Sequence, residues 1–329
     1  MKYLIIGGAG IFALHTIKKI LQLKDTKKVI SVGRNRERSS EAFTLGIGKG
    51  DDRYSYKQIH LTFEIDFLTD LIDTYEPDFI VNFAALAYAT SWNKSSRYYD
   101  TNITAVAKLC EHLYDKKFLK QFLQIGSSEI YGGTKEPAKE NSLPNPTSPY
   151  AVSKLAADYH MLSLYNHMGF PTNVIRPSNC YGSGQYMYRV IPKAILYGLM
   201  GKKFPLEGGG KVLKSFMHAA DLADAIITIL HSKKFGKIYN AGVTKPNSIR
   251  EIVESVSKNL KLDFNKFCEI TEGRKTEDNQ YCIDSSLIKD ELGWEAKITL
   301  DEGVDEVVQW VKKYQDILID EPQSFTLRA

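Results

Sequence analysis

The chain begins with a short apolar segment that runs directly into a glycine-rich turn and then into a helical pattern. Lys2–Ile6 has the length of a buried strand, Gly7–Gly10 follows at once, and Ile11–Leu23 has helical periodicity. Glycines let the backbone approach a pyrophosphate, and the helix N-terminus offers free N–H groups with a partial positive charge. This order predicts a dinucleotide-binding unit, with Ala13 allowing close helix–strand packing. A purely structural turn is the alternative.

Further apolar runs alternate with helical patterns through the first half of the chain. Such alternation predicts an α/β fold of the Rossmann type, a doubly wound parallel sheet whose ligand crevice lies at the carboxyl ends of its strands. The expected strands are Val29–Val32, Ile59–Ile65, Phe79–Phe83, Phe122–Ile125 and Thr172–Ile175, and the expected helices include Phe67–Tyr75 and residues 97–114.

The alternation becomes irregular after about residue 177, and a chain of 329 residues is long enough for two lobes. We assign residues 1–177, with a return of the chain around 213–243, to an NAD(P)-binding Rossmann domain. Residues 178–212 and 244–329 are assigned to a smaller, interleaved C-terminal substrate lobe that binds a nucleotide sugar.

Composition narrows the range of partners. The 43 Lys and Arg residues nearly balance the 39 Asp and Glu residues, so the net charge of +4 predicts neither nucleic-acid nor membrane-surface binding. No apolar run reaches the roughly 18 residues of a membrane helix, and the N-terminus reads as a strand rather than a signal peptide, so we expect a cytoplasmic protein. The four cysteines are widely spaced, and no metal site is expected.

The residues after Val32 bear on the choice between NAD and NADP. NAD-binding units usually place Asp or Glu there for the adenosine ribose, whereas this chain has Gly33 followed by Arg34. Charged hydrogen bonds to an extra 2′-phosphate slightly favour NADP over NAD, although a solvated basic loop is the alternative. The other residues of this group are Arg36, Arg38, Ser39 and Ser40.

Asp66 and Phe67 follow the expected third strand and have two open roles. They can hydrogen-bond and flank the adenine of the cofactor, or Asp66 can simply cap the helix that follows.

A tyrosine and a lysine lie four residues apart near the start of a later helix. Ser148 has the character of an N-cap and Pro149 that of a first helical residue, which places Tyr150 and Lys154 on one helix face. The positive helix end and the neighbouring ammonium are expected to lower the pKa of the Tyr150 phenol. The phenol would then take a proton from an alcohol during hydride transfer to a nicotinamide.

Together these motifs resemble the extended short-chain dehydrogenase/reductase superfamily, and most closely its nucleotide-sugar 4,6-dehydratases, of the dTDP-glucose and GDP-mannose types. The segments that carry the resemblance are Gly7-x-x-Gly10-x-x-Ala13, Asp66-Phe67, Asn82–Ala85, Thr101-Asn102, Gly126–Gly132, Tyr150-x-x-x-Lys154, Arg176–Gly182 and Glu291–Trp294. The resemblance implies a tightly held NAD(P), a nucleotide-diphosphate sugar as substrate, and a homodimer formed by the helices around residues 97–114 and 150–168.

Each part of the cofactor is expected to meet a particular group of residues at the carboxyl edge of the sheet. On the motifs and the resemblance together, the cofactor-binding residues are Gly7, Gly10, Ile11, Phe12, Arg34, Asp66, Phe67, Phe83, Ala84, Ala85, Ala87, Thr101, Tyr150, Lys154 and Pro177.

The segment after the fifth strand bears on the reaction. The dTDP-glucose dehydratases have Thr-Asp-Glu where this chain has Ser127, Ser128 and Glu129, so their acid for the C6 hydroxyl is missing. The GDP-mannose dehydratases resemble this chain in having Ser before the Glu, UDP-glucuronate decarboxylases also have Ser-Glu, and ordinary 4-epimerases lack the Glu. With Tyr150 and Lys154, these three residues form the expected catalytic group.

The resulting hypothesis is a 4,6-dehydratase. Oxidation of C4 to a ketone makes the C5 proton acidic, Glu129 removes it, water leaves from C6, and the stored hydride returns to C6. The alternatives are a C4 dehydrogenase or epimerase without loss of water and, less favoured, a UDP-uronate decarboxylase or a non-catalytic dinucleotide-binding module.

Four residues are expected to bind the substrate. Lys214 replaces the arginine that relatives place there, which exchanges a bidentate contact for a point charge. The full set is Asn179, Arg189, Lys214 and Arg274.

Overall fold

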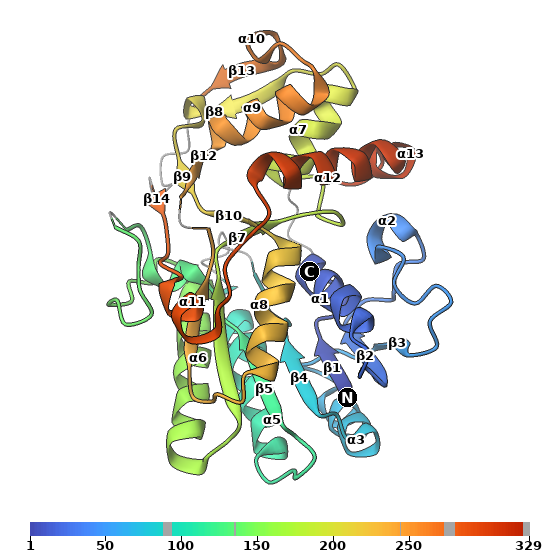
Figure 1. Cartoon of the computed structure of the whole chain (residues 1–329), viewed down its shortest axis with the longest axis vertical. Coiled ribbons are helices and arrows are strands. Elements are labelled where there is room, and N and C mark those ends of the chain that lie inside the picture. The colour runs from blue at the N-terminus through green and yellow to red at the C-terminus, as the bar shows by residue number, and fades with distance from the viewer. Residues whose placement is uncertain (88–93, 135, 244, 273–279, 325–329) are drawn as a thin grey trace.

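The computed structural model describes residues 1–87, 94–134, 136–243, 245–272 and 280–324. Its centre is a parallel sheet of seven strands in the order β11-β6-β5-β4-β1-β2-β3 (Figure 1). The strand order reverses between β1 and β4, which is the switch point where such sheets bind ligands. The strands are β1 Lys2–Ile6, β2 Lys28–Gly33, β3 Tyr54–Gln58, β4 Phe79–Asn82, β5 Gln121–Ile125, β6 Thr172–Pro177 and β11 Ile238–Ala241. The predicted doubly wound Rossmann fold is confirmed.

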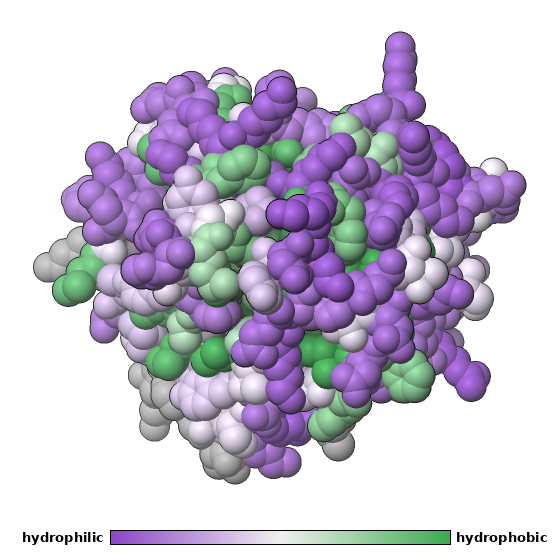
Figure 2. All heavy atoms as spheres, turned by 90° about the horizontal axis from the view of Figure 1, so that it is seen from below, coloured by the Kyte–Doolittle hydropathy of each residue, from purple (hydrophilic) through white to green (hydrophobic). Residues whose placement is uncertain are grey.

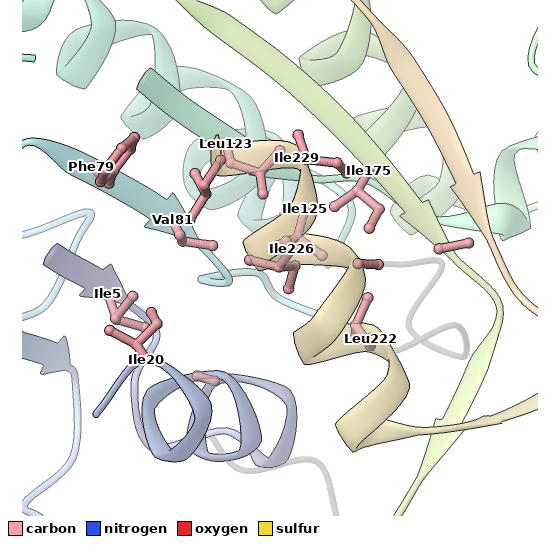
Figure 3. Close-up of a cluster of buried hydrophobic side chains, with 14 of the residues drawn as sticks. Ile5, Ile20, Phe79, Val81, Leu123, Ile125, Ile175, Leu222, Ile226 and Ile229 are labelled. Carbon is pink, nitrogen blue, oxygen red and sulfur yellow. The ribbon is translucent and has the colours of Figure 1, made fainter. Parts of the chain in front are cut away.

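Helices cover both faces of this sheet. On one face lie α1 Ile11–Gln22 and α8 Ala219–His231, and Figure 3 shows their side chains meeting those of the central strands. The other face packs against α3 Ile65–Tyr75, α5 Ala105–Leu113 and α6 Pro149–Met168. Because alternate strand residues point to opposite faces, Ile5 enters the first core and Leu4 the second.

A further hydrophobic core lies beyond the carboxyl ends of the strands (Figure 1). It is built mainly from α7 Val190–Leu199, α9 Ile249–Leu260 and α12 Leu300–Lys313. The assignment of residues to two domains stays a prediction. The remaining elements here are β7 Asn179–Tyr181, β8 Phe204–Glu207, β9 Leu213–Lys214, β10 Phe216–His218, β12 Asn247–Ser248, α10 Phe264–Phe267, β13 Cys268–Thr271, β14 Gln280–Tyr281, α11 Ser286–Leu292 and α13 Gln315–Leu318.

The third strand differs from the prediction. It is Tyr54–Gln58, and the apolar residues 59–65 that were expected to form it instead lead into α3. β3 is an edge strand that pairs with β2 alone, so tyrosines and polar residues suffice for it and an apolar run is not needed.

The helix expected over residues 97–114 is present but changes its winding. It consists of α4 Ser96–Tyr99, a π-helical turn at Asp100–Thr104, and then α5. Such wide turns frequently occur at functional sites. Two further short segments are the 3₁₀ helices Ser128–Tyr131 and Gly208–Gly210, and the four-residue helix α2 is Glu41–Thr44.

Seen from below, at the end of the molecule opposite the C-terminal lobe, the surface is largely hydrophilic with scattered hydrophobic residues (Figure 2). Within the described ranges, no helix combines the length and the apolar character needed to cross a lipid bilayer.

Candidate active site

The glycine turn forms a cradle at the switch point of the sheet. Gly7 has φ +84°, and a Cβ there would lie 2.6 Å from the Ala84 nitrogen, so only glycine lets the turn lie against the loop after β4. The N–H groups of Gly7 and Gly8 donate to the Val32 carbonyl, which fixes the turn. Gly10 is the N-cap of α1 and has no side chain to cap the helix. The first N–H groups of α1, those of Ile11 and Phe12, therefore lie next to the glycine turn and donate no hydrogen bond to a side chain at the N-cap position.

Replacing Gly7 by alanine is expected to abolish dinucleotide binding, because the new methyl group would push the turn away from Ala84. The positive φ alone should cost about 1–3 kcal/mol of unfolding free energy. Gly201→Ala is the matched control, since Gly201 has φ +65° and nothing within 4 Å of its added Cβ. Denaturant unfolding and calorimetric titration with NAD and NADP measure both effects. Equal binding by the two variants would contradict the role of the cradle.

The loop after β4 is held by a buried asparagine that sequence reasoning did not select for the site. The Asn102 side chain bonds to both the N–H and the carbonyl of Leu86, at 2.8 and 3.1 Å. It also donates to the Ser153 hydroxyl, which in turn donates to the Tyr150 carbonyl. Asn102 therefore joins the segment of Phe83, Ala84, Ala85 and Ala87 to the helix that carries Tyr150. The sequence indicates Asn102 only as part of the segment Thr101-Asn102, because the π-helical turn that contains it is visible only in the structure.

The position of β3 changes the expected adenine contacts. Asp66 is the second residue of α3 and Glu64 is its N-cap position, so Asp66 is neither the cap nor the residue that ends a strand. The capping role of Asp66 is therefore wrong. Phe67 is 67% exposed, and contact of Asp66 and Phe67 with the cofactor stays a prediction. Thr62 lies beside the predicted cofactor residue Thr101, with 3.3 Å between the two hydroxyls.

The end of β2 has no acidic residue, as the sequence indicated. A Cβ at Gly33 would lie 2.5 Å from the Tyr56 hydroxyl, so the tyrosine occupies the space of a side chain there. Arg34 and Arg36 are exposed, whereas Arg38 pairs with Glu321 and stacks 3.2 Å from the centre of the Phe43 ring. Ser40 caps α2. Arg38 is exposed as well, but its guanidinium is engaged by Glu321 and Phe43, whereas the guanidinium groups of Arg34 and Arg36 have no such partner among the described residues.

Tyr150 and Lys154 lie in the first two turns of α6, where Ser148 is the N-cap and Pro149 the first residue, as predicted. The expectation of a lowered tyrosine pKa is wrong. Burial, reinforced by the nearby Glu129 carboxylate, raises the pKa of Tyr150, and a hydrogen bond with Ser127 opposes the rise. Burial lowers the pKa of Lys154 to about 8, and its ammonium donates to the Ile125 carbonyl.

The segment after β5 brings a carboxylate to the tyrosine. Ser127 accepts a hydrogen bond from the Glu129 N–H at 3.2 Å and caps the 3₁₀ helix that follows. Burial raises the pKa of Glu129, while Lys214 and Arg189 counteract the rise. A carboxylate that lies between a phenol and two cations, and whose pKa is raised by burial, is suited to take up and return a proton.

The predicted substrate residues gather beside this carboxylate, with one exception. Lys214 and Arg189 both act on Glu129, and Asn179 lines a small cavity together with Ser128. Arg274 lies outside the described residues. Sequence reasoning missed the other residues around the cavity, which are Tyr131, Gly132, Ser178, Ser215, Cys282 and Ile283. Ser178 follows β6 within the segment Arg176–Gly182, to which no role in the site was given, whereas Cys282 and Ile283 follow β14, outside the motifs. Pro177 ends β6 next to them.

Comparison with known proteins places this site in a family. The model of the family described as GDP-mannose 4,6 dehydratase matches residues 4–307. The chain therefore belongs to this family of nucleotide-sugar dehydratases, and the predicted family is confirmed.

Individual relatives agree with this assignment. The structure of dTDP-glucose 4,6-dehydratase from Bacillus anthracis in complex with NAD is 30% identical, with a TM-score of 0.85, over 96% of this chain and 98% of that one. The human dTDP-D-glucose 4,6-dehydratase is 26% identical over 95% of this chain and 90% of its own length.

A plant relative is longer than this chain. It is a trifunctional enzyme of Arabidopsis thaliana (UDP-glucose 4,6-dehydratase, UDP-4-keto-6-deoxy-D-glucose 3,5-epimerase and UDP-4-keto-L-rhamnose-reductase), 27% identical over 93% of this chain. This chain spans 46% of that enzyme's length. Solved C4 epimerases below 25% identity share the fold alone. The bacterial, human and plant relatives are each named for a 4,6-dehydratase activity.

Proposed function

We propose that this protein is an NAD(P)-dependent 4,6-dehydratase of a nucleotide-diphosphate sugar. The observation that carries the proposal is the placement of Glu129 beside Tyr150, close enough for the carboxylate to raise the pKa of the phenol. A C4 epimerase or dehydrogenase needs the tyrosine but has no use for a second base at C5. The buried carboxylate therefore favours elimination over oxidation alone.

The chain's own residues fit a dinucleotide. The cradle at Gly7 would be filled by a Cβ, and the first N–H groups of α1 begin beside it, as a pyrophosphate requires. Tyr150 and Lys154 would hold the nicotinamide ribose end, and Thr62, Thr101 and Arg34 the adenosine end. When bound, the nicotinamide supplies a reversible acceptor for the C4 hydride, which is later returned to C6.

The residues divide the proton transfers between them. Tyr150, hydrogen-bonded to Ser127, takes the C4 hydroxyl proton as C4 becomes a ketone. The ketone acidifies the C5 proton, which Glu129 removes. Glu129 then passes this proton to the departing C6 hydroxyl, so that water leaves. A proton equivalent to the one taken from the C4 hydroxyl returns to C5, and the product is a 4-keto-6-deoxy sugar.

Because this chain has Ser128 in place of the aspartate of the dTDP-glucose dehydratases, we assign to Glu129 both the removal of the C5 proton and the protonation of the C6 hydroxyl. Ser128 lines the cavity, but a hydroxyl is too weakly acidic to protonate a leaving group by itself. The raised pKa of Glu129 suits it to carry the proton from C5 to the C6 oxygen.

Arg34 is proposed to select NADP by contacting the 2′-phosphate. It is exposed beside Gly33, whereas Arg38 is already engaged by Glu321. Arg34→Ala should weaken NADP binding about tenfold and leave NAD binding within about twofold, since one charged hydrogen bond contributes about 1.5–3 kcal/mol. Calorimetric titration of both cofactors measures this. Lys57→Ala on the edge strand is the control, and equal losses for NAD and NADP would contradict the selection.

The wider assembly follows the same proposal. Asn179, Arg189, Lys214 and Arg274 are proposed to bind the nucleotide diphosphate, within the two-domain division given above. We also propose a homodimer. Its support lies on α6, one of the helices through which the family resemblance implies a dimer. Val152 and Tyr159, seven residues apart on this helix, are 40% and 52% exposed, so two large apolar side chains lie on its surface. A cytoplasmic location is part of the same proposal.

Mass spectrometry of the reaction products tests the proposed function. The protein is incubated with GDP-, UDP-, dTDP- and CDP-hexoses, and we expect one of them to lose about 18 Da, the mass of one water. Loss of 2 Da with net cofactor reduction, or an unchanged mass with C4 inversion, would instead identify a dehydrogenase or an epimerase.

A further inference from the structure

A buried ion pair lies behind the proposed catalytic residues. Arg176 on β6 and Asp158 on α6 are 2% and 0% exposed, and the arginine Nε lies 2.8 Å from the carboxylate Oδ2. The glycine that follows β5 makes room for them, because a Cβ at Gly126 would lie 3.0 Å from both side chains. Burial raises the pKa of the Asp158 carboxyl, and the arginine counteracts the rise. A pair this deep contributes little net stability, which invites a functional explanation.

Arg176 also reaches the segment that carries Glu129. Its Nη1 donates to the Tyr131 hydroxyl at 2.7 Å, and that hydroxyl donates to the Asn240 side chain at 2.9 Å. Tyr131 lies two residues after Glu129 in the same 3₁₀ helix. One guanidinium therefore connects α6, β6 and the segment after β5, and through Asn240 it also reaches β11.

The two carboxylate oxygens of Asp158 differ in their partners, since only Oδ2 accepts a hydrogen bond from Arg176. Among the described residues, Oδ1 is buried and has no hydrogen-bond partner. Asp158 lies four residues after Lys154 on α6, a spacing that brings side chains together on one helix face. The carboxylate favours the charged form of Lys154 against the effect of burial.

We propose that Asp158 and Arg176 are positioning residues, which keep Lys154 charged beside Tyr150 and hold the Glu129 segment in register with α6. The proposal rests on the proposed dehydratase function. Neither residue touches the substrate. Each acts through another residue, Asp158 through Lys154 and Arg176 through Tyr131.

The sign of the effect follows from the charges around Lys154. Asp158 is the group that favours its ammonium, so loss of the carboxylate lowers the pKa of Lys154 below its present value of about 8. The same loss lowers the pKa of Tyr150, because Asp158 is one of the groups that raise it. The titratable groups on α6 besides Lys154 are Tyr150, Asp158, Tyr159, His160, Tyr165 and His167. Those on the elements packed against α6 are Arg97, Tyr98, Tyr99, Asp100, Glu129, Tyr131 and Arg176.

Asp158→Asn tests the electrostatic part with the purified protein. Both limbs of the pH profile of kcat/KM should move to lower pH by about one unit, the smallest shift typical of a nearby buried charge. Activity at pH 8 should fall about fivefold, because a pKa of Lys154 one unit below about 8 leaves roughly a tenth of the lysine charged at that pH instead of half. Asp224→Asn, which removes an exposed ion-pair partner on α8, is the matched control. A uniform loss of activity with an unmoved profile would overturn the proposal, since a purely structural role gives that result.

A second readout does not depend on turnover. Lysine side chains labelled with ¹³C at Cε are titrated by NMR, and the Lys154 signal is identified by its absence in Lys154→Arg. We expect its midpoint to lie lower in Asp158→Asn than in the wild type. If the wild type dehydrates no sugar but this midpoint moves, the electrostatic link stands and the proposed function fails. If dehydration occurs and the midpoint does not move, the link fails.

Tyr131→Phe tests the positioning part and keeps the ion pair, so it covers the case in which Asp158→Asn does not fold. Without the hydroxyl, Arg176 loses its hydrogen bond to the Glu129 segment and keeps only the contact with the ring. Water loss should slow about tenfold, while C4 oxidation, followed by nicotinamide absorbance in a single turnover, stays within about twofold. Tyr197→Phe on α7, where the ring packs against Phe204, is the control. Equal slowing of both steps, or of neither, would overturn the positioning role.

Discussion

Tyr150→Phe should lower kcat by about 10²–10⁴, the range that a positioned general base supplies. The phenylalanine keeps the ring but has no oxygen to take the C4 hydroxyl proton, so hydride transfer from C4 cannot begin. Binding of the cofactor should weaken by no more than about tenfold, since one hydrogen bond to the nicotinamide ribose contributes about 0.5–1.5 kcal/mol and the cradle at Gly7 is untouched. Stopped-flow absorbance of the nicotinamide measures the first step directly, and calorimetric titration measures cofactor binding.

The control for this variant lies on α7. Tyr197→Phe removes an equivalent hydroxyl from a tyrosine whose ring packs against Phe204, and it should leave kcat unchanged. A Tyr150→Phe protein that oxidises C4 at a rate near the wild type would contradict the assignment, and would indicate that Lys154 or a bound water takes the proton instead.

Glu129→Gln should separate the two halves of the reaction. The amide has nearly the shape of the carboxylate but cannot accept the C5 proton, so water loss should fall about 10²–10⁴ while C4 oxidation continues. The expected result is reduced nicotinamide that accumulates on the protein, together with a 4-keto sugar that keeps its C6 hydroxyl. Quenched single turnovers analysed by mass spectrometry measure both species.

An exposed glutamate provides the comparison for this variant. Glu111→Gln on α5 changes a carboxylate to an amide far from the cavity and should have no effect on either step. If Glu129→Gln slowed oxidation and elimination by the same factor, the carboxylate would be acting on C4 chemistry, and the dehydratase mechanism would lose its base.

The parts of the fold and site that the sequence could predict are those set by local chemistry. The turn at Gly7 follows from the conformations that only glycine adopts, and the start of α6 follows from Ser148 and Pro149. The segment Ser127–Glu129 was located by motif. In each case a few neighbouring residues determine the backbone, so reading along the chain is sufficient.

Other parts depend on contacts between distant residues. The edge strand β3 has no apolar run because it pairs with a neighbour on one side only, and the expected strand was therefore placed about six residues too late in the chain. Asp66 and Phe67 consequently lie in α3 and not directly after a strand. The pKa of Tyr150 depends on Glu129, 21 positions earlier in sequence, and on burial. The proposed positioning role of Arg176 depends on the contact between β6, α6 and the segment after β5, which are distant in sequence.

The most direct test of the account uses a nucleotide sugar carrying deuterium at C4, with the sugar identified from the panel above. The account predicts a product that has lost water and carries the deuterium at C6, with a solvent-derived hydrogen at C5, as read by NMR. Deuterium that remains at C4, or that leaves in reduced cofactor while the C6 hydroxyl is retained, would contradict the proposed 4,6-dehydratase.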